Sequence, residues 1–377
     1  IKYFLPRQNC GSYFFNITKQ VEPASLLLNN KKIMSNQKRV AVVILNWNGS
    51  NMMRQFLPSV VKGTGEDGEV IVADNGSSDD SCDMLSREFP DIKQIRLPKN
   101  YGFAEGYNQA LKQTDAEFFL LLNSDVEVSE GWLKPLLEYM DSHQDVAACQ
   151  PKILSFKERN RFEYAGAAGG FLDIYGYPYC RGRVFADVEN DEGQYDDIAD
   201  VLWATGAALM IRAEDWRATG GLDGRFFAHQ EEIDLCWRLR RRGRRIVCIP
   251  QSKVWHVGGA SLEQGNPRKT FLNFRNNLAM LYKNLPEKQL CRVMRWRFWL
   301  DYLAALQFVL KGDVANAKAI RQGRKAFKQW KGELKADRQR LMQEATTNDV
   351  PEIAPYSLLW QYYAKGKKIF SKLPTLL

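Results

Sequence analysis

A short polar triplet directly after a run of apolar residues is the first candidate for chemistry in this chain of 377 residues. Asn123, Ser124 and Asp125 follow the apolar segment Phe118–Leu122. Open α/β sheets bind ligands at the carboxyl ends of their strands, so a carboxylate at this position is placed to hold a metal ion. Asn, Ser and Asp are also ordinary turn residues, and the triplet alone fits a plain turn equally well.

Further polar segments occur in the order that a site at the end of a sheet would need. Each of them alone is compatible with an ordinary turn, a capped helix or a strand end. It is their order along one chain that indicates a common site. The segments are Asp74–Asp79, Asn100–Asn108, Glu231–Arg238 and Val254–His256.

Short apolar runs alternate with segments of helical periodicity through the first half of the chain, and these elements would position the polar residues. The alternation predicts a mostly parallel central sheet flanked by helices, because crossover helices join parallel strands. The strands are almost wholly apolar, as expected when helices cover both faces of a sheet. We predict strands at Val40–Leu45, Glu69–Ala73, Ile92–Leu97 and Phe118–Leu122, and helices at Asn51–Val61, Asp79–Glu88 and Phe103–Lys112.

Two common nucleotide-binding motifs are absent from the sequence. The first predicted strand leads into Asn46-Trp47-Asn48-Gly49-Ser50 rather than into Gly-x-Gly-x-x-Gly, which argues against a nicotinamide dehydrogenase. No Gly-x4-Gly-Lys-Ser/Thr loop occurs either, which argues against an ATPase or kinase.

Taken in order, the polar segments resemble family 2 of the inverting glycosyltransferases, and the resemblance extends over about Val40–Leu285. Within this family the sequence most nearly resembles the bacterial rhamnosyltransferase-like branch, which acts in surface-polysaccharide synthesis. The resemblance implies a GT-A fold, a Rossmann-like nucleotide-sugar domain. It also implies transfer of a sugar from a UDP- or dTDP-linked donor to a saccharide or lipid-linked acceptor. Glu232 and Asn123 stand where many members have Asp, so a catalytically inactive protein that binds sugar nucleotides or polysaccharide remains an alternative.

The resemblance implies roles in donor binding for residues of several segments. The acidic residue that ends the second strand would contact the nucleobase, and the loop and helix start after the third strand would pass beneath the diphosphate. Trp203 borders the acceptor cleft in this reading, although it fits the core equally well. The residues assigned to nucleotide-sugar binding are Asp74, Asn75, Asn100, Gly102, Asn108, Asn123, Ser124 and Trp203.

The resemblance also implies a divalent cation and a general base. Asp125 matches the last residue of the family's Asp-x-Asp element, and His256 matches a position where His can complete the metal shell or contact a phosphate. These ligands suit Mg²⁺ or Mn²⁺. Glu232 matches the base that takes the acceptor proton, with Glu231 as the alternative. We expect Asp234 and Arg238 to form an ordinary helix pair, and the run Arg240–Arg245 to be a solvated helix end.

Composition limits the setting in which the protein works. The seven cysteines are scattered and lack any Cys-x-x-Cys pair, which favours reduced thiols in the cytoplasm. No run reaches the roughly 20 apolar residues of a membrane-spanning helix. The formal net charge of +9 by itself indicates only non-specific attraction, so we do not expect a nucleic-acid partner.

We predict three parts along the chain. Residues 1–33 would be an upstream extension before a translation start at Met34, residues 34–285 the glycosyltransferase domain, and residues 286–377 a basic helical extension. Between Cys291 and Lys331 ten Lys or Arg oppose two acidic residues. This segment would contact the inner face of the cytoplasmic membrane peripherally, or pack on the catalytic domain or on another subunit. The aromatic-rich segment 147–199 would either bind the acceptor or cover the edge of the sheet.

Overall fold

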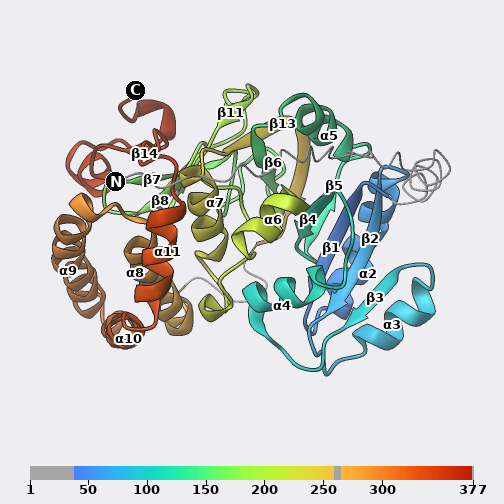
Figure 1. Cartoon of the computed structure of the whole chain (residues 1–377), viewed down its shortest axis with the longest axis horizontal. Helices are drawn as coiled ribbons and strands as arrows, with labels where there is room; N and C mark the ends of the chain where they lie inside the picture. The colour runs from blue at the N-terminus through green and yellow to red at the C-terminus, as the bar shows by residue number, and fades with distance from the viewer. Residues whose placement is uncertain (1–37, 259–264, 376–377) are drawn as a thin grey trace, which may run out of the picture. The chain divides into compact units, whose positions relative to one another are not determined.

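The computed structural model describes residues 38–258 and 265–375, so the predicted extension 1–33 and the start at Met34 lie outside the described residues. The described chain is built around a central sheet of nine strands (Figure 1), in the order β11-β13-β6-β12-β4-β1-β2-β3 with β5 paired to β13. Its first half consists of β1 (Val40–Asn46), α2 (Ser50–Thr64), β2 (Gly68–Asp74), α3 (Ser81–Glu88), β3 (Lys93–Arg96), α4 (Gly102–Leu111) and β4 (Phe118–Leu122).

The first half of the sheet confirms the predicted parallel arrangement. Strand β1 pairs in parallel with both β2 and β4, and β2 pairs in parallel with β3. All five residues of β4 are buried, as expected for a strand covered on both faces. The carboxyl ends of β1, β2 and β4 therefore lie together at one edge of the sheet.

The second half of the sheet is mixed. Strand β12 runs antiparallel to both β4 and β6, whereas β13 runs parallel to β6 and antiparallel to β5. This half comprises β5 (Val126–Val128), α5 (Leu133–Ser142), β6 (Val146–Ser155), β11 (Ala199–Asp200), β12 (Ala208–Arg212), α6 (Ala213–Thr219), η1 (Gly224–Phe226), α7 (Glu231–Arg241) and β13 (Arg245–His256).

The aromatic-rich segment forms a second, five-stranded sheet that the sequence does not predict, in the order β10-β9-β8-β7-β14. Its last strand comes from the C-terminal part of the chain and pairs in parallel with β7. Phe370 packs against both Phe171 and Tyr179 on this sheet, so segments far apart in sequence share one aromatic cluster. The strands are β7 (Gly170–Asp173), β8 (Pro178–Cys180), β9 (Arg183–Val184), β10 (Asp187–Val188) and β14 (Ile353–Ala354).

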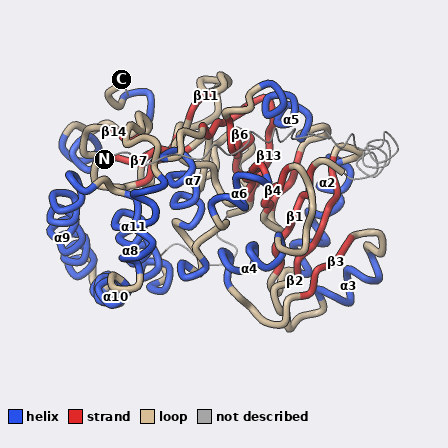
Figure 2. Tube along the Cα trace, in the orientation of Figure 1, coloured by secondary structure: helices blue, strands red, loops and turns tan. Residues whose placement is uncertain are grey.

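Four long helices follow β13 and gather at the side opposite β1–β3 (Figures 1 and 2). They are α8 (Pro267–Asn284), α9 (Glu287–Leu310), α10 (Val314–Trp330) and α11 (Leu334–Glu344), followed by the short turns η2 (Trp360–Ala364) and η3 (Phe370–Lys372). Buried Asp301 on α9 accepts hydrogen bonds from Arg297 and from Arg324 of α10, which ties these two helices together. None of the helices in the described residues is long and apolar enough to cross a membrane.

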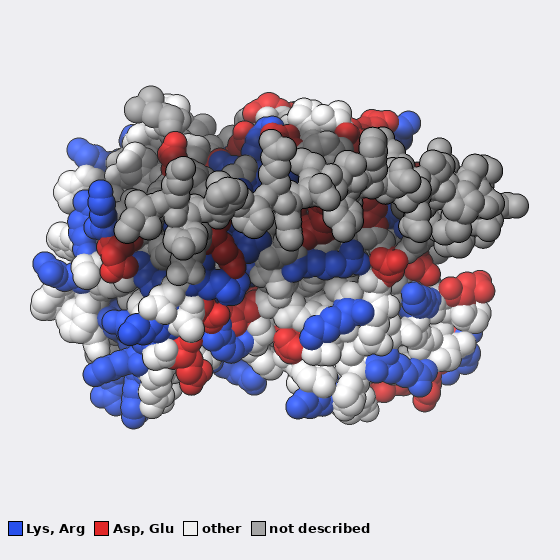
Figure 3. Space-filling model, in the orientation of Figure 1, with Lys and Arg blue, Asp and Glu red and all other residues white. Residues whose placement is uncertain are grey.

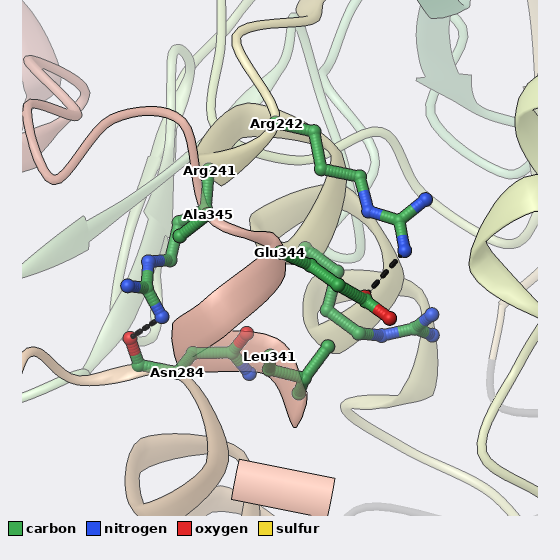
Figure 4. A pocket seen from close by; sticks show the side chains of 7 residues that line it. Arg241, Arg242, Asn284, Leu341, Glu344 and Ala345 are labelled. Carbon is green, nitrogen blue, oxygen red and sulfur yellow. Dashed lines mark hydrogen bonds and ion pairs between the residues drawn. The ribbon is translucent and has the colours of Figure 1, made fainter. Parts of the chain in front are cut away.

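The arginine run at the end of α7 corrects one prediction. Instead of forming a solvated helix end, Arg240 pairs with Glu352 at 2.6 Å, and Arg242 pairs with Glu344 at 2.5 Å. Arg241 is buried and donates to the backbone oxygen of Asn284 (Figure 4). The prediction was wrong because the partners of these cations lie more than 40 residues further along the chain, where no local pattern reveals them.

The predicted pair of Asp234 and Arg238 is confirmed, but it is buried and belongs to a larger network. Asp234 is fully buried and accepts from Arg238 at 2.9 Å and from Lys283 at 2.8 Å. Its second oxygen accepts from Asn284 at 2.8 Å. The network joins α7 to α8.

We expect Asp234→Asn to destabilise the protein by about 3–5 kcal/mol, because it removes the carboxylate that pairs with buried Arg238 and one of the two carboxylates that pair with Lys283, the other being Asp223. The free energy of unfolding from urea titration measures this loss. Glu130→Gln is the matched control, since its pair with Lys62 is 81% and 76% exposed and such surface pairs contribute about 0–1 kcal/mol. Equal stability of the two variants would show that the network does not hold α7.

Candidate active site

The end of β2 presents Asp74 to the edge of the sheet. Asp74 lies opposite Asn46 in the register of β1 and β2 and accepts a hydrogen bond from the Asn46 side chain at 3.1 Å. The backbone N–H of Ser77 donates to its other oxygen at 3.0 Å. Both side chains are buried, and among the described residues Asn46 Oδ1 has no hydrogen-bond partner. A buried acceptor without a partner is costly, so this point suits a ligand that donates hydrogen bonds.

Asn75 and Asn100 shape the loop before α4. The Asn75 side chain donates to the Gly102 backbone oxygen at 3.0 Å and accepts from the Tyr101 backbone at 3.0 Å. Asn100 accepts from the Gly102 N–H at 2.7 Å. Gly102 has a φ of 78°, and a Cβ there would lie 2.4 Å from the ring of Phe227. Only glycine therefore fits at this helix start.

Asn108 is placed to support the fold. Its side chain accepts from the N–H of Leu222 at 3.0 Å and donates to the carbonyl of the same residue at 2.8 Å. It also donates to Glu105 at 3.0 Å. These bonds occupy both amide hydrogens, so the structure gives Asn108 the task of joining α4 to the loop after α6.

Asp125 and His256 come together because β5 pairs with β13. His256 lies opposite Val126 in the strand register, and its Nε2 is 3.1 Å from Asp125 Oδ1. The Asn123 side chain lies 3.2 Å from the same nitrogen. Asp125 and His256 are both more than 90% buried. Three residues predicted from two separate segments thus meet at one point.

Glu163 is a neighbour of this group that the sequence does not reveal. Its Oε1 lies 3.6 Å from Nδ1 of His256, beyond hydrogen-bond distance, and Nδ1 has no hydrogen-bond partner within the described residues. Burial lowers the pKa of His256, but the hydrogen bond to Asp125 and the proximity of Glu163 outweigh it and raise that pKa to about 10. Glu163 sits in the aromatic-rich segment, where no motif marks it.

Asp125 fits a divalent cation such as Mn²⁺ or Mg²⁺, because these ions prefer oxygen ligands, and His256 would add a nitrogen donor once it has lost its proton. Residues 38–258 and 265–375 contain no group of three or more His, Cys, Asp or Glu side chains in metal-binding proximity. Within the described residues, Asp125 and His256 are therefore the pair that would hold a cation.

Glu231 and Glu232 begin α7, where the helix dipole favours negative charge. Glu231 is buried, whereas Glu232 is partly exposed, and within the described chain one carboxylate oxygen of each is buried without a hydrogen-bond partner. Burial raises the pKa of Glu232 to about 7. Burial, together with the neighbouring charge of Glu232, raises the pKa of Glu231 well above its ordinary value. Such an unpaired carboxylate with a pKa near neutrality is suited to accept a proton.

Two other predicted residues differ in placement. Trp203 is 3% exposed and donates to the backbone oxygen of Phe171 at 3.1 Å, so it lies in the core, the placement that fitted the sequence equally well. Ser124 is partly exposed between Asn123 and Asp125. The six cysteines in the described residues are free.

The mixed central sheet and its flanking helices have the GT-A fold. The crystal structure of GalNAc-T7 with UDP, GalNAc and Mn²⁺ matches this chain with a TM-score of 0.53 at 15% identity, covering 80% of this chain and 57% of that one. Residues 41–191 match the family model Glycosyl transferase family 2. Residues 41–191 thus match a family 2 glycosyltransferase domain, which confirms the predicted likeness to this family, and the solved structure confirms the predicted fold.

Curated relatives include proteins of polysaccharide synthesis. The O-antigen biosynthesis protein RfbC of Myxococcus xanthus is 29% identical over 51% of this chain and 15% of its own length. The N-acetylglucosaminyl-diphospho-decaprenol L-rhamnosyltransferase of Mycobacterium tuberculosis is 24% identical over 57% of this chain and 75% of its own. These matches confirm the predicted likeness to the rhamnosyltransferase-like branch.

Proposed function

We propose that this protein is an inverting glycosyltransferase that moves a sugar from a UDP- or dTDP-linked donor to a saccharide or lipid-linked acceptor in cell-surface polysaccharide synthesis. One observation carries the proposal beyond the family. At the head of α7, Glu232 combines a buried carboxylate oxygen that lacks a hydrogen-bond partner in the described chain with a pKa near neutrality. Buried carboxylates without partners are costly, so this arrangement indicates a catalytic base.

The reaction would be a single in-line displacement at the anomeric carbon. Glu232 takes the proton of the acceptor hydroxyl, whose oxygen forms the new glycosidic bond while the bond to the diphosphate breaks. Asp74 binds the nucleobase, and Asn75 and Asn100 hold the loop that passes beneath the diphosphate. Asp125 and His256 would hold Mg²⁺ or Mn²⁺, which as a Lewis acid stabilises a departing nucleoside diphosphate.

Thermal unfolding with a panel of nucleoside diphosphates and sugar nucleotides, with Mn²⁺ and again with chelator, tests donor binding. We expect a metal-dependent rise of the melting temperature with a uridine or thymidine sugar. Purified saccharide and lipid-linked acceptors then test transfer. Binding of a donor without turnover on any acceptor would favour the inactive binding protein, and no binding of any donor would contradict both.

The pH dependence of transfer follows from Glu232. Its carboxyl group must lose its proton before it can act, and its pKa is about 7. We therefore expect kcat/KM to rise with pH, to reach half its maximum near pH 7, and to level above it. An ascending limb at pH 4 to 5 would show that the base is an ordinary exposed carboxylate.

Membrane contact forms a second part of the proposal and rests on the surface of α9. Eight of the fifteen exposed large hydrophobic side chains of the described residues lie on this one helix. The most prominent of them recur at helical spacing and form one stripe. The stripe consists of Trp296, Trp299, Leu303, Leu306 and Leu310, each at least half exposed.

The basic helix α10 packs beside α9. Arg324 of α10 stacks over the rings of Phe298 and Tyr302, so the basic face of α10 adjoins the aromatic side of α9. Lys and Arg side chains gather in this region at the lower left of Figure 3. Tryptophans, leucines and flanking cations suit the surface of an anionic bilayer, whereas the same charges repel a second copy of the helix. We infer that α9 lies on anionic lipid, at the inner face of the cytoplasmic membrane.

Co-sedimentation with phosphatidylglycerol-containing vesicles tests this surface against pure phosphatidylcholine. We expect salt-sensitive binding to the anionic vesicles only, and its loss in the double variant Trp299→Glu, Leu303→Glu. Ile198→Glu is the control, because this side chain is 39% exposed but lies away from α9. The inference would be overturned if the wild type did not bind the anionic vesicles. It would also be overturned if the wild type were a dimer that the double variant converts to a monomer, because the stripe would then be a subunit interface.

A further inference from the structure

The segment that leads into the two glutamates of α7 has an unusual backbone. Phe227, His229 and Gln230 have φ values of 66°, 71° and 74°. None of them is glycine, and L-residues rarely adopt this left-handed region. Such a conformation persists only where surrounding contacts determine it, and it occurs often at functional sites. Something outside the segment must therefore hold its shape.

Asn276 of α8 makes the required contacts. Its side-chain amide donates to three backbone oxygens of the segment, those of Phe226 and Ala228 at 2.9 Å and that of His229 at 2.8 Å. Asn276 is completely buried, and its own oxygen accepts from Arg275 at 2.9 Å. One side chain thus fixes three of the four carbonyls between residues 226 and 229.

Two further contacts fix the ends of the same segment. Asn277, the next residue of α8, donates to the Gln230 side chain at 3.0 Å, directly before Glu231. At the other end, the carbonyl of Phe227 accepts from the backbone of Phe103 at 2.7 Å, at the start of α4. The segment is therefore held between the helix start predicted to face the diphosphate and the helix α8.

We propose that Asn276 is a positioning residue for the general base, which it serves by imposing the left-handed backbone that orients Glu232. The inference rests on the proposed function, since it assigns a task in the same reaction. Asn276 touches neither donor nor acceptor in this scheme and acts only through the segment 226–230. If the amide hydrogens of Asn276 are lost, the segment 226–230 relaxes. The carboxylate of Glu232 then moves away from the position in which it faces the acceptor hydroxyl.

Asn276→Asp is the sharpest variant, because it keeps the size and the acceptor of the side chain but removes both donors. We expect kcat to fall by about 10²-fold, the effect of a shift of about an ångström in a reacting group. The KM for the donor should stay close to that of the wild type, because the contacts of Asp74 and Asp125 are untouched. The ascending limb of the pH profile should also move, since the surroundings of Glu232 change.

Asn316→Ala is the matched control. Asn316 is a buried asparagine of α10 that likewise donates to a backbone oxygen, that of Gly265 at 2.8 Å, but does not contact the segment 226–230. We expect it to lower the melting temperature with little change of kcat. The inference would be overturned if both variants lost kcat in proportion to their loss of stability. It would also be overturned if kcat were unchanged in Asn276→Asp.

Hydrogen exchange separates this inference from the proposed function. Amides of residues 226–232 should exchange faster in Asn276→Asp than in the wild type, while those of β1 and β4 stay protected. This readout does not need turnover. If the wild type transfers no sugar but exchange rises locally, the proposed function fails and the structural support stands. If the wild type is active and exchange is unchanged, Asn276 is not the support.

Discussion

Glu232→Gln should reduce sugar transfer by about 10³-fold, within the range that a positioned general base contributes. The amide keeps the shape of the side chain but cannot accept the acceptor proton. We expect donor affinity to remain, because Asp74 and Asp125 lie on other elements, so the loss should appear in kcat. Initial rates with saturating donor, together with titration of the nucleotide, measure both quantities.

The stability of the same variant distinguishes an inactive enzyme from an unfolded one. The pKa of Glu232 in the folded protein, about 7, lies above its ordinary value of 4.5, so the folded state holds this proton more tightly than the unfolded state. The contribution to stability is complete below about pH 4.5 and is lost as the pH rises through 7. Glu232→Gln should therefore match the wild type in acid and exceed its melting temperature at pH 8.

Glu231→Gln is the companion variant. Glu231 is more completely buried than its neighbour, and its carboxyl group is the less accessible of the two. We expect a smaller loss of kcat than in Glu232→Gln. A full loss in Glu231→Gln with an active Glu232→Gln would reverse the assignment of the base.

Asp125→Asn should have the second large effect, a fall in kcat/KM of about 10²–10³-fold, typical of losing one stabiliser of developing negative charge. The amide is a poorer metal ligand than the carboxylate, and His256 loses its anionic partner at 3.1 Å. Calorimetric titration of UDP in the presence and absence of Mn²⁺ should show that the metal no longer improves nucleotide affinity.

Asp145→Asn serves as control for this variant, since Asp145 carries an exposed pair with Arg245 away from the site. Its kinetics should match those of the wild type. An Asp125→Asn protein that keeps metal-dependent nucleotide affinity would remove Asp125 from the metal site and leave it a structural partner of His256.

The parallel half of the sheet and its edge residues could be predicted because their signals are local. Strands β1, β2 and β4 each contain an apolar run of four to six residues; Asp74 directly follows the run in β2, and Asp125 follows the run in β4 after Asn123 and Ser124. Parallel strands bring these carboxyl ends together whatever the rest of the chain does. The order of the motifs was enough to predict that Asp125 and His256 belong to one site. In the structure, the antiparallel pairing of β5 with β13 brings the two residues together.

The remaining parts depend on contacts between distant residues and leave no local pattern. Glu163 reaches His256 across 93 positions, and Asn276 reaches Ala228 across 48. The small second sheet takes one strand from residues 353–354, which no periodicity connects with residues 170–173. Arg240 and Arg241, at the end of α7, look like a solvated helix end because their partners Glu352 and Asn284 lie 112 and 43 residues further along the chain. Sequence patterns show which residues are polar, whereas tertiary packing decides which of them meet.

The ion pairs around α7 bear on the exchange of parts between related enzymes. Arg240 in the last turn of α7 and Arg242 directly after it pair with Glu352 and Glu344 of the C-terminal part. A chimera joined at the predicted boundary near residue 285 would place these arginines against the carboxylates of another protein, or against none. To transfer acceptor specificity between related enzymes, α7 and the helices that follow it should therefore be exchanged together. The junction then belongs within β12 or α6, where it leaves these ion pairs intact.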